Sequence, residues 1–323
     1  MITDVPGIRV GHATDPGLTG CTIILTEREA VGGVELRGWA TGVHGLDFLD
    51  PRHLAPGVNG VMLAGGSAFG LESIWGAMEW LEAQGFGFPV GRTVVPHVAG
   101  AILFDLNVGD HRARPTRSMG YQACAKARPG AVEEGNVGAG AGASVGKLFG
   151  IARAMRGGVG TASMKVGGLV VGALVAVNAL GDVRDPETGQ LLAGARDSAN
   201  GRKLVDSAQA LRRGTPLAGF VPQHTTIGVV ATNGRLTKPE ASKVAQLAML
   251  GFARALSPPH TAVDGDVLFC LSVGEASADP TTVGLAAAEA VAQAIARAVR
   301  AAASLPGLPA WKELAAPNDR NFF

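Results

Sequence analysis

The sequence predicts an α/β protein in which sheets are covered by helices. Three observations indicate this class: short apolar runs rich in Val and Ile alternate with amphipathic segments, these β-prone runs come in adjacent pairs, and 47 of the 323 residues are glycine. Such alternation is typical of mixed α/β folds, and the paired runs argue against a simple doubly wound parallel sheet. The glycines are interleaved with Val, Ile and Leu rather than Ser, Gln and Pro, so they indicate tight turns in a folded chain.

The N-terminal part begins with short strands, predicted over residues 22–25 and 38–43. Residues 61–64 predict a buried strand that ends in a glycine turn and starts a helix, which stops at Gly85. The apolar face of that helix carries Phe69, Ile74, Met78 and Leu81. A turn between a strand and a helix can hold an anion or a substrate end on free N–H groups, and it can equally be plain packing.

The glycine-rich segment 129–150 suggests a phosphate-binding loop, but the pattern does not fit. Only three residues separate Gly142 from Gly146 where the motif needs four, and Leu148 stands where a magnesium-binding Ser or Thr should be. Lys147 remains of interest. It is either a desolvated lysine with a lowered pKa that can donate to a reacting carbonyl, or a solvent-facing residue near a helix start.

The middle of the chain predicts a hairpin-like pair of strands followed by surface segments. Residues 167–178 are strongly β-prone and end at Asn178. Residues 182–189 predict an exposed turn, and the more polar residues 197–213 predict a surface linker.

The C-terminal part predicts a strand over residues 225–232, a turn at Asn233 and Gly234, and a capping box from Thr237 to Glu240. The helix that follows has one apolar face: Val244, Leu247, Ala248, Gly251, Phe252 and Ala255. A strand over residues 267–272 comes next, and then an Ala-rich helix over about 282–304. Because small residues dominate this last helix, we expect it to pack closely against a sheet or another helix.

Composition limits the function classes. Lys and Arg number 28 and Asp and Glu 27, for a formal net charge of +1, which removes attraction to nucleic acid or to an acidic membrane as an organising function. The longest apolar runs, residues 166–180 and 286–305, are broken by glycine, glutamine or arginine, so neither is expected to span a membrane. The N-terminus shows no basic stretch followed by an apolar one, and we expect a cytoplasmic protein.

The three cysteines, Cys21, Cys124 and Cys270, stand far apart without a C-x-x-C pair. This spacing disfavours a zinc knuckle or a disulfide framework. We therefore expect buried, inert thiols.

Thr225 begins a predicted buried strand after the polar, extended residues 221–224. A threonine hydroxyl is a poor nucleophile without an adjacent base, and a chain cut just before Thr225 would supply one, the freed α-amino group. The ordinary pKa of such an amine, about 7.7 to 8.0, suits proton transfer near neutral pH. From the residues alone, Thr225 and Thr226 can equally be ordinary strand residues.

Five separated motifs resemble the autoprocessed L-aminopeptidase/D-esterase family, peptidase family S58, which includes β-aminopeptidases and nylon-oligomer hydrolases. They are residues 65–71, residues 138–147, Asn178, residues 225–233 and Asp264-Gly-Asp266. The resemblance extends from residues 4–12 to the C-terminal helix. The Thr nucleophile with Asp-Gly-Asp is nearer to the nylon-hydrolase-like branch than to the β-aminopeptidases.

The resemblance implies a four-layer αββα fold with an N-terminal-nucleophile site, made as one domain over residues 1–323. Self-cleavage would give an α part (1–224) and a β part (225–323), which stay together and assemble further, commonly as a tetramer of such pairs. No metal or organic cofactor is implied.

The same resemblance assigns the site residues. Thr225 would be the nucleophile and its freed amine the base, with Asp264 and Asp266 orienting that amine and stabilising its charge. Asn178 would donate to the oxyanion. Lys147 would be a second donor or hold the Thr225 hydroxyl. His224 departs from the pattern, since relatives usually carry a small or amide residue there. A bulky imidazole either slows self-cleavage or helps to move protons.

The expected function is hydrolysis of amide bonds in small partners: short peptides, D- or β-amino acid amides and, as a side activity, 6-aminohexanoate oligomers. We expect no nucleic acid and no membrane partner, and a homo-oligomer. Two alternatives remain open: acyl transfer to an amine, as in ornithine acetyltransferases, and an unprocessed, non-catalytic assembly protein.

Overall fold

The computed structural model describes residues 1–217 and 224–315. In that part, one mixed sheet runs in the order β10-β11-β14-β16-β2-β4-β7-β3, and β1 also pairs with β2. These strands are β1 (Arg9–Asp15), β2 (Thr19–Leu36), β3 (Val43–His44), β4 (Val58–Ala64), β7 (Val98–Ile102), β10 (Gly158–Val166), β11 (Leu169–Asn178), β14 (Thr225–Gly234) and β16 (Val267–Ala276). Residues 221–223, predicted to be extended, lie outside the described residues.

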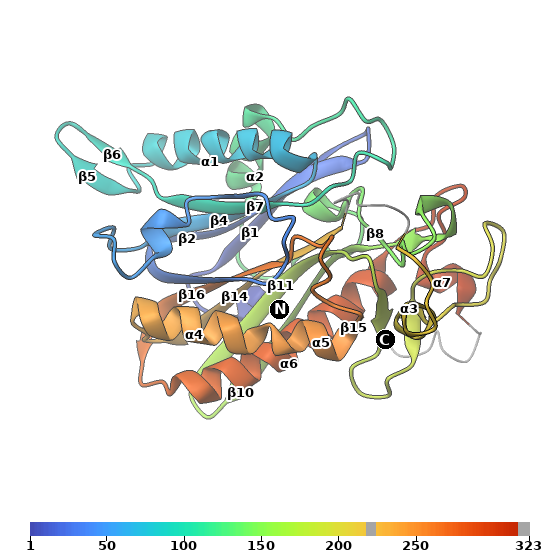
Figure 1. Ribbon diagram of the computed structural model, residues 1–323. Coiled ribbons are helices and arrows are strands. Elements are labelled where there is room, and N and C mark those ends of the chain that lie inside the picture. Colours follow the sequence, from blue (N-terminus) through green and yellow to red (C-terminus); the bar gives the residue numbers. More distant parts are fainter. Residues whose placement is uncertain (218–223, 316–323) are drawn as a thin grey trace.

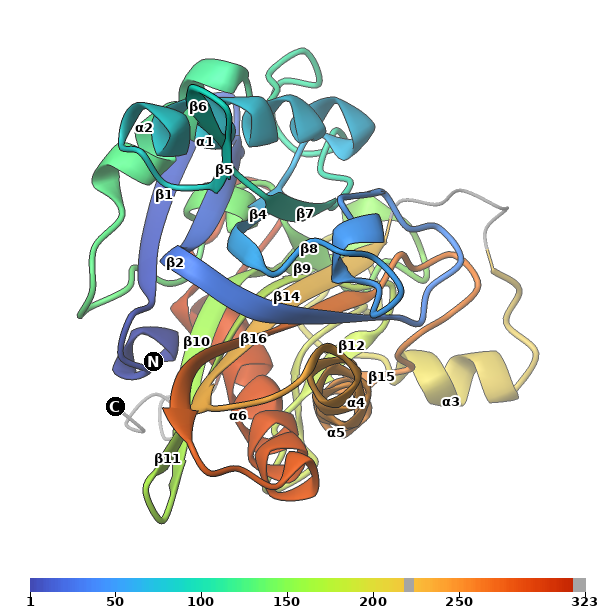
Figure 2. The ribbon, with the colours of Figure 1, turned by 90° about the vertical axis from the view of Figure 1, so that its left-hand side faces the viewer.

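The long strand β2 joins two halves of this sheet. Its first part pairs antiparallel with β1 and β4, and its last part pairs antiparallel with β16, where Leu36 lies opposite Val267. The pairing register with β4 shifts between Leu25 and Ala30, which is where the strand changes partners. Figure 2 shows the half with β4 and β7 above the half with β14 and β16.

Helices cover the outer face of each half (Figure 1). The half that contains β4 is covered by α1 (Glu72–Ala83) and α2 (Arg117–Lys126), and the half that contains β14 by α4 (Lys238–Ala248), α5 (Leu250–Ala255) and α6 (Pro280–Ala301). Three hydrophobic clusters lie between these layers: one under α1 and α2, one between the two sheet halves, and one under α4 to α6. The predicted α/β class is confirmed.

The remaining elements are short. They are α3 (Ser207–Arg212), α7 (Trp311–Leu314), β5 (Phe88–Val90), β6 (Thr93–Val95), β8 (Ser144–Val145), β9 (Met155–Arg156), β12 (Asp182–Arg184), β13 (Leu191–Ala193) and β15 (Leu256–Ser257).

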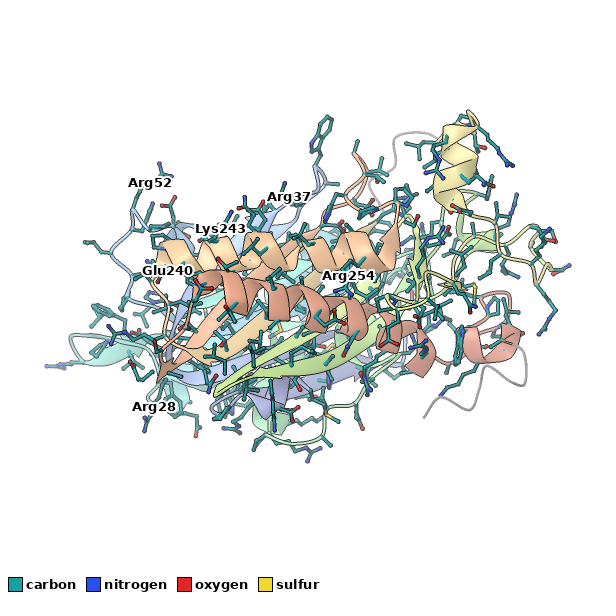
Figure 3. All side chains as sticks on the ribbon, turned by 90° about the horizontal axis from the view of Figure 1, so that it is seen from below. Arg28, Arg37, Arg52, Glu240, Lys243 and Arg254 are labelled. Atoms are coloured by element: carbon teal, nitrogen blue, oxygen red, sulfur yellow. The ribbon has the colours of Figure 1, made fainter. Side chains whose placement is uncertain are left out.

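The predicted capping box at the start of α4 is confirmed. The Thr237 hydroxyl accepts a hydrogen bond from the Glu240 N–H, and the Glu240 carboxylate accepts one from the Thr237 N–H at 2.8 Å. Figure 3 labels Glu240, Lys243 and Arg254 along this helical layer, which lies in front of the sheet in that view. Polar residues on one side and the apolar cluster on the other fix how α4 and α5 face the core.

The Ala-rich helix α6 packs as closely as its composition predicts. A Cβ added to Gly160 of β10 would lie 2.1 Å from the Ala294 carbonyl oxygen, and one added to Gly251 of α5 would lie 2.4 Å from that of Ala288. Within the described residues, α6 alone is long and apolar enough to cross a membrane by length and composition, but 72% of its apolar window is buried inside the protein. It is placed as a core helix.

The predictions for Phe69 and for residues 182–189 are wrong in detail. Phe69 does not belong to the buried helix face: it lies in the 3-10 turn Ser67–Leu71, is exposed, and has the Arg114 guanidinium 3.6 Å from its ring centroid. Asp182 and Val183 are buried in β12, so the exposed turn is confined to the residues after them.

Residues 38–42 form no strand, although their pattern predicts one. The N–H groups of Arg37 and Gly38 donate to the Asp266 carbonyl at 3.0 and 3.4 Å, and that of Ala40 donates to the Asp264 carbonyl at 3.1 Å. The segment therefore pairs with a turn instead of a neighbouring strand. We call residues 37–40 the strap.

Candidate active site

The strand order brings polar residues that are distant in sequence to one end of three neighbouring strands, β11, β14 and β16. Asn178, the last residue of β11, lies directly opposite Thr225, the first residue of the antiparallel strand β14. Strand β16 runs parallel to β14, and a bridge between His224 and Asp264 places the Asp264-Gly-Asp266 turn beside the start of β14. Asn178, Thr225 and the Asp264-Gly-Asp266 turn thus converge in space.

The peptide bond between His224 and Thr225 lies at the centre of this group. The Thr225 hydroxyl donates to the His224 carbonyl oxygen, and the Gly265 N–H donates to the same oxygen at 2.9 Å. Thr225 is 3% exposed and His224 9% exposed, so water has little access to either. A hydroxyl and a polarising N–H therefore meet on one carbonyl group in a buried setting.

The His224 imidazole is held neutral. Burial, and then the nearby Lys147 ammonium, lowers the pKa of His224 well below its usual value. Its Nδ1 atom is buried and has no hydrogen-bond partner among the described residues. The imidazole is thus not placed as a proton carrier at neutral pH.

The two aspartates are buried and fully engaged by local donors. Asp266 accepts from the Thr226 N–H at 2.7 Å and from His260 Nδ1 at 2.9 Å. Asp264 accepts from the Leu180 N–H at 3.2 Å and from the Thr261 hydroxyl and N–H. Burial, and then the neighbouring Asp266, raises the pKa of Asp264.

Lys147 is buried, and its solvent-facing alternative is wrong. Its Nζ donates to both the carbonyl oxygen and Oδ1 of Asn178, each at 2.8 Å. Burial lowers the pKa of Lys147 to about 7, although Asp264 and Asp105 oppose the shift. The N–H of Lys147 donates to the Leu180 carbonyl at 2.9 Å, which holds this lysine beside β11.

The Asn178 side chain is oriented by three neighbours. Besides Lys147, the Ser144 N–H donates to Oδ1 at 3.0 Å. The amide nitrogen donates to the Phe104 carbonyl at 2.9 Å. These contacts fix which end of the amide carries the N–H groups.

Asp105, at the end of the segment after β7, was not singled out from the sequence. Its buried carboxylate accepts from the Gly66 N–H at 2.7 Å and the Thr19 hydroxyl at 2.8 Å. The N–H group of Gly66 is therefore taken up inside the protein, which favours the packing interpretation of the turn at residues 65–71. A lone aspartate after an apolar run gives no signal in the sequence.

A cavity of about 100 Å³ opens beside the His224–Thr225 bond. Lys147, His224 and Ser144 are among its polar lining residues, and Leu148, Leu180 and Val263 among its apolar ones. A small substrate group fits a space of this character.

Two expectations about cysteines and metals can be compared with the described residues. Cys21, Cys124 and Cys270 are free and buried, and burial raises the pKa of Cys21 and Cys270 to about 12. Across residues 1–217 and 224–315, no three His, Cys, Asp or Glu side chains are grouped to hold a metal ion.

Comparisons with known structures agree with this fold. The structure resembles the L-aminopeptidase D-Ala-esterase/amidase from Ochrobactrum anthropi, described as a new variant among the Ntn hydrolase fold, with a TM-score of 0.69, 23% identity, and coverage of 93% of this chain and 86% of that one. It also resembles the PH0078 protein from Pyrococcus horikoshii, with a TM-score of 0.69, 22% identity and the same coverage. The fold is thus that of a mixed α/β protein whose structural neighbours are Ntn hydrolase variants.

The sequence comparisons give the family. The model of peptidase family S58 matches residues 1–310, and the chain belongs to this family. An uncharacterized aminopeptidase of Mycobacterium leprae is 40% identical, covering 96% of this chain and 92% of its own length. A 6-aminohexanoate-oligomer endohydrolase of a Kocuria species is 31% identical, covering 87% of this chain and 77% of its own length. Family and relatives place the chain among hydrolases of peptide and amide bonds.

Proposed function

We propose that this protein is an autoprocessed amide hydrolase whose nucleophile is Thr225. The chain is made as one precursor, and cleavage after His224 produces an α part (1–224) and a β part (225–323). The mature enzyme then forms an acyl-enzyme on Thr225 with short peptides, D- or β-amino acid amides or 6-aminohexanoate oligomers. The names of the relatives, aminopeptidase and 6-aminohexanoate-oligomer endohydrolase, support this range.

One observation carries the proposal: the Thr225 hydroxyl and the Gly265 N–H both bond to the His224 carbonyl oxygen. In self-cleavage, Thr225 Oγ1 forms a bond to the His224 carbonyl carbon, and the bond from that carbon to the Thr225 nitrogen breaks. The hydroxyl proton ends on the freed amine. Water then hydrolyses the ester, giving the His224 carboxylate and a Thr225 with a free amine and a free hydroxyl.

In the mature enzyme, the freed amine takes the hydroxyl proton as Thr225 attacks a substrate carbonyl. Asp266 accepts from the Thr226 N–H and so lies beside the new N-terminus, where its charge and that of Asp264 stabilise the protonated amine. We assign Asn178, which lies opposite Thr225, and Lys147, which donates to Asn178, as side-chain donors to the developing oxyanion; one such donor typically contributes about 10² to 10³ in rate.

The wider arrangement belongs to the same proposal. We take the two helical layers and the two sheet halves as the four layers of an αββα sandwich, and the mature protein as a cytoplasmic tetramer of αβ pairs. The three hydrophobic clusters between layers support the first part.

The variant Thr225→Ala tests the proposal. We expect a single uncut chain without amide hydrolysis but with an unchanged circular dichroism spectrum, whereas Thr225→Ser, which keeps a hydroxyl, should still cleave and hydrolyse. Hydrolysis by Thr225→Ala would place the nucleophile elsewhere. Adding a free amine as acceptor to the wild type separates hydrolysis from acyl transfer, because a transferase gives an amide product.

A further inference from the structure

We propose that the cavity beside His224 is the pocket for the acyl side chain of the substrate, and that it selects uncharged side chains of imidazole size or somewhat larger over cationic ones. This inference rests on the proposed function. It adds what that function leaves open, the chemical class of the residue whose carbonyl is attacked.

The chemistry of self-cleavage connects the precursor to the substrate. The ester formed during self-cleavage joins the His224 carbonyl carbon to Thr225 Oγ1. An acyl-enzyme formed from a substrate joins the substrate carbonyl carbon to the same Oγ1. Since Thr225 Oγ1 carries the acyl group in both esters, we take the side chain next to the carbonyl to lie in the same place in both. His224 thus shows where a substrate side chain sits.

The size of the pocket follows from its contents in the precursor. His224 is buried, with 9% of the residue exposed, and it lines the cavity together with Leu148, Leu180 and Val263. The space of about 100 Å³ is additional to the imidazole. A branched aliphatic or aromatic side chain therefore fits without displacing the walls, and its burial favours binding.

The charge preference follows from the groups that face the imidazole. Lys147 lines the same cavity, and its ammonium adds to the effect of burial in favouring the neutral His224 ring. The buried Nδ1 atom meets no acceptor among the described residues. Asp105 also lines the cavity, but its carboxylate oxygens accept from Gly66 and Thr19. A second buried cation in this space would face Lys147 without a carboxylate dedicated to it, and like charges in such a setting are strongly disfavoured.

The experiment compares two series. In the first, the self-cleavage rate is measured for wild type and for His224→Leu, His224→Phe and His224→Lys. In the second, kcat/KM of the wild-type mature enzyme is measured for amides whose acyl residue is His, Leu, Phe or Lys. We expect the same order in both, with the lysine member slower than the others by more than about tenfold. The second series uses wild-type protein, so a variant that fails to fold does not remove the test.

A pocket variant supplies the matched measurement. Ile151 lines the cavity and is half-buried, whereas Leu285 is an exposed residue of α6 outside it. We expect Ile151→Trp to lower kcat/KM for the Phe amide relative to the Gly amide by several-fold, and Leu285→Trp to leave that ratio unchanged.

Three results would overturn the pocket assignment: unrelated orders in the two series, a lysine member as fast as leucine, or an unchanged Phe-to-Gly ratio in Ile151→Trp. Hydrolysis by Thr225→Ala would instead overturn the proposed function, so the two failures are distinguishable.

Discussion

Arg196 and Lys147 are both buried cations, but their surroundings differ. Within the described residues, the Arg196 guanidinium donates to backbone carbonyls alone, those of Ala152, Ala154, Ala199, Gly201 and Gly307. Near it, the Asp182 carboxylate accepts from the Ala195 N–H and from the N–H and hydroxyl of Ser207. Arg196 and Asp182 thus hold the surrounding loops in place through hydrogen bonds. Lys147 instead donates to Asn178 and lines a cavity, with the buried carboxylates of Asp105 and Asp264 close enough to act on its charge.

The difference shows how to separate structural from chemical charges in a buried site. A charged side chain whose N–H groups all donate to loop carbonyls stabilises the fold, because its removal leaves those carbonyls without a hydrogen-bond donor. A charge that faces a cavity, with a pKa moved toward neutral pH, is suited to act on a ligand. The predictions below test this contrast.

Lys147→Met should give the largest effect, mainly on activity. We expect kcat to fall by about 10² to 10³ because a proposed oxyanion donor is lost. The melting temperature should fall less than in Arg196→Met, because only the two Asn178 oxygens lose this donor and the unfavourable burial of a cation is removed at the same time. Kinetics and thermal unfolding of the same sample check both halves. Retained activity together with lost stability would mean that Lys147, like Arg196, has a structural role.

Arg196→Met should show the opposite pattern. Several buried carbonyls lose their donor, so we expect the free energy of unfolding to fall by about 3 kcal/mol. It is best measured in the Thr225→Ala background, where the chain is expected to stay continuous. For kcat, Arg196→Met is made in protein that keeps Thr225. The folded fraction of that variant at 20 °C should have the kcat of the wild type. A normal melting temperature for this variant would contradict the contrast.

Gly38→Ala tests whether the strap supports the site. The added Cβ would lie 2.2 Å from the Asp264 carbonyl oxygen and 2.5 Å from the Asp266 nitrogen, so the turn with both aspartates must shift. We expect kcat to fall by about 10- to 100-fold with KM nearly unchanged. Gly42→Ala is the control, because its Cβ meets only the flexible Ile102 side chain, at 2.6 Å. Equal effects on kcat from both variants would contradict a role of the strap in positioning the turn that carries Asp264 and Asp266.

Asp182 gives an effect that is confined to the pH dependence of stability. Burial raises the pKa of Asp182 from 3.8 to about 6 in the folded state. Its raised pKa favours folding fully below about pH 4, and this contribution is lost as pH rises through 6, a difference of about 3 kcal/mol at about 1.4 kcal/mol per pKa unit. Comparing Thr225→Ala with and without Asp182→Asn, we expect the stability gap to narrow from pH 4 to pH 7. A stability difference between the two proteins that grows from pH 4 to pH 7 would contradict the raised pKa of Asp182.

Much of the fold could be predicted from the sequence where the pattern is local. The apolar run from residue 225 and the Thr237 capping box depend on neighbours along the chain, and both are confirmed. Residues 38–42 were predicted wrongly because their partner is the turn at residues 264–266, more than 200 residues away, and no local pattern shows it.

The site could be predicted only in part. Sequence motifs pointed to Thr225, Asn178 and Lys147, but their meeting depends on the antiparallel pairing of β11 with β14 and on the glycine-rich path of the chain before Lys147. Asp105 and Gly265 were missed as contributors. The first acts through a backbone N–H and a hydroxyl far away in sequence, and the second through its own N–H, which any residue type carries.

The most direct test of the central claim is the covalent state of active protein, determined by intact mass and by N-terminal sequencing of the smaller fragment. The account predicts two fragments, residues 1–224 and 225–323, with the smaller one beginning Thr-Thr-Ile-Gly. Fully active material consisting of one chain, with the bond between His224 and Thr225 intact, would contradict it.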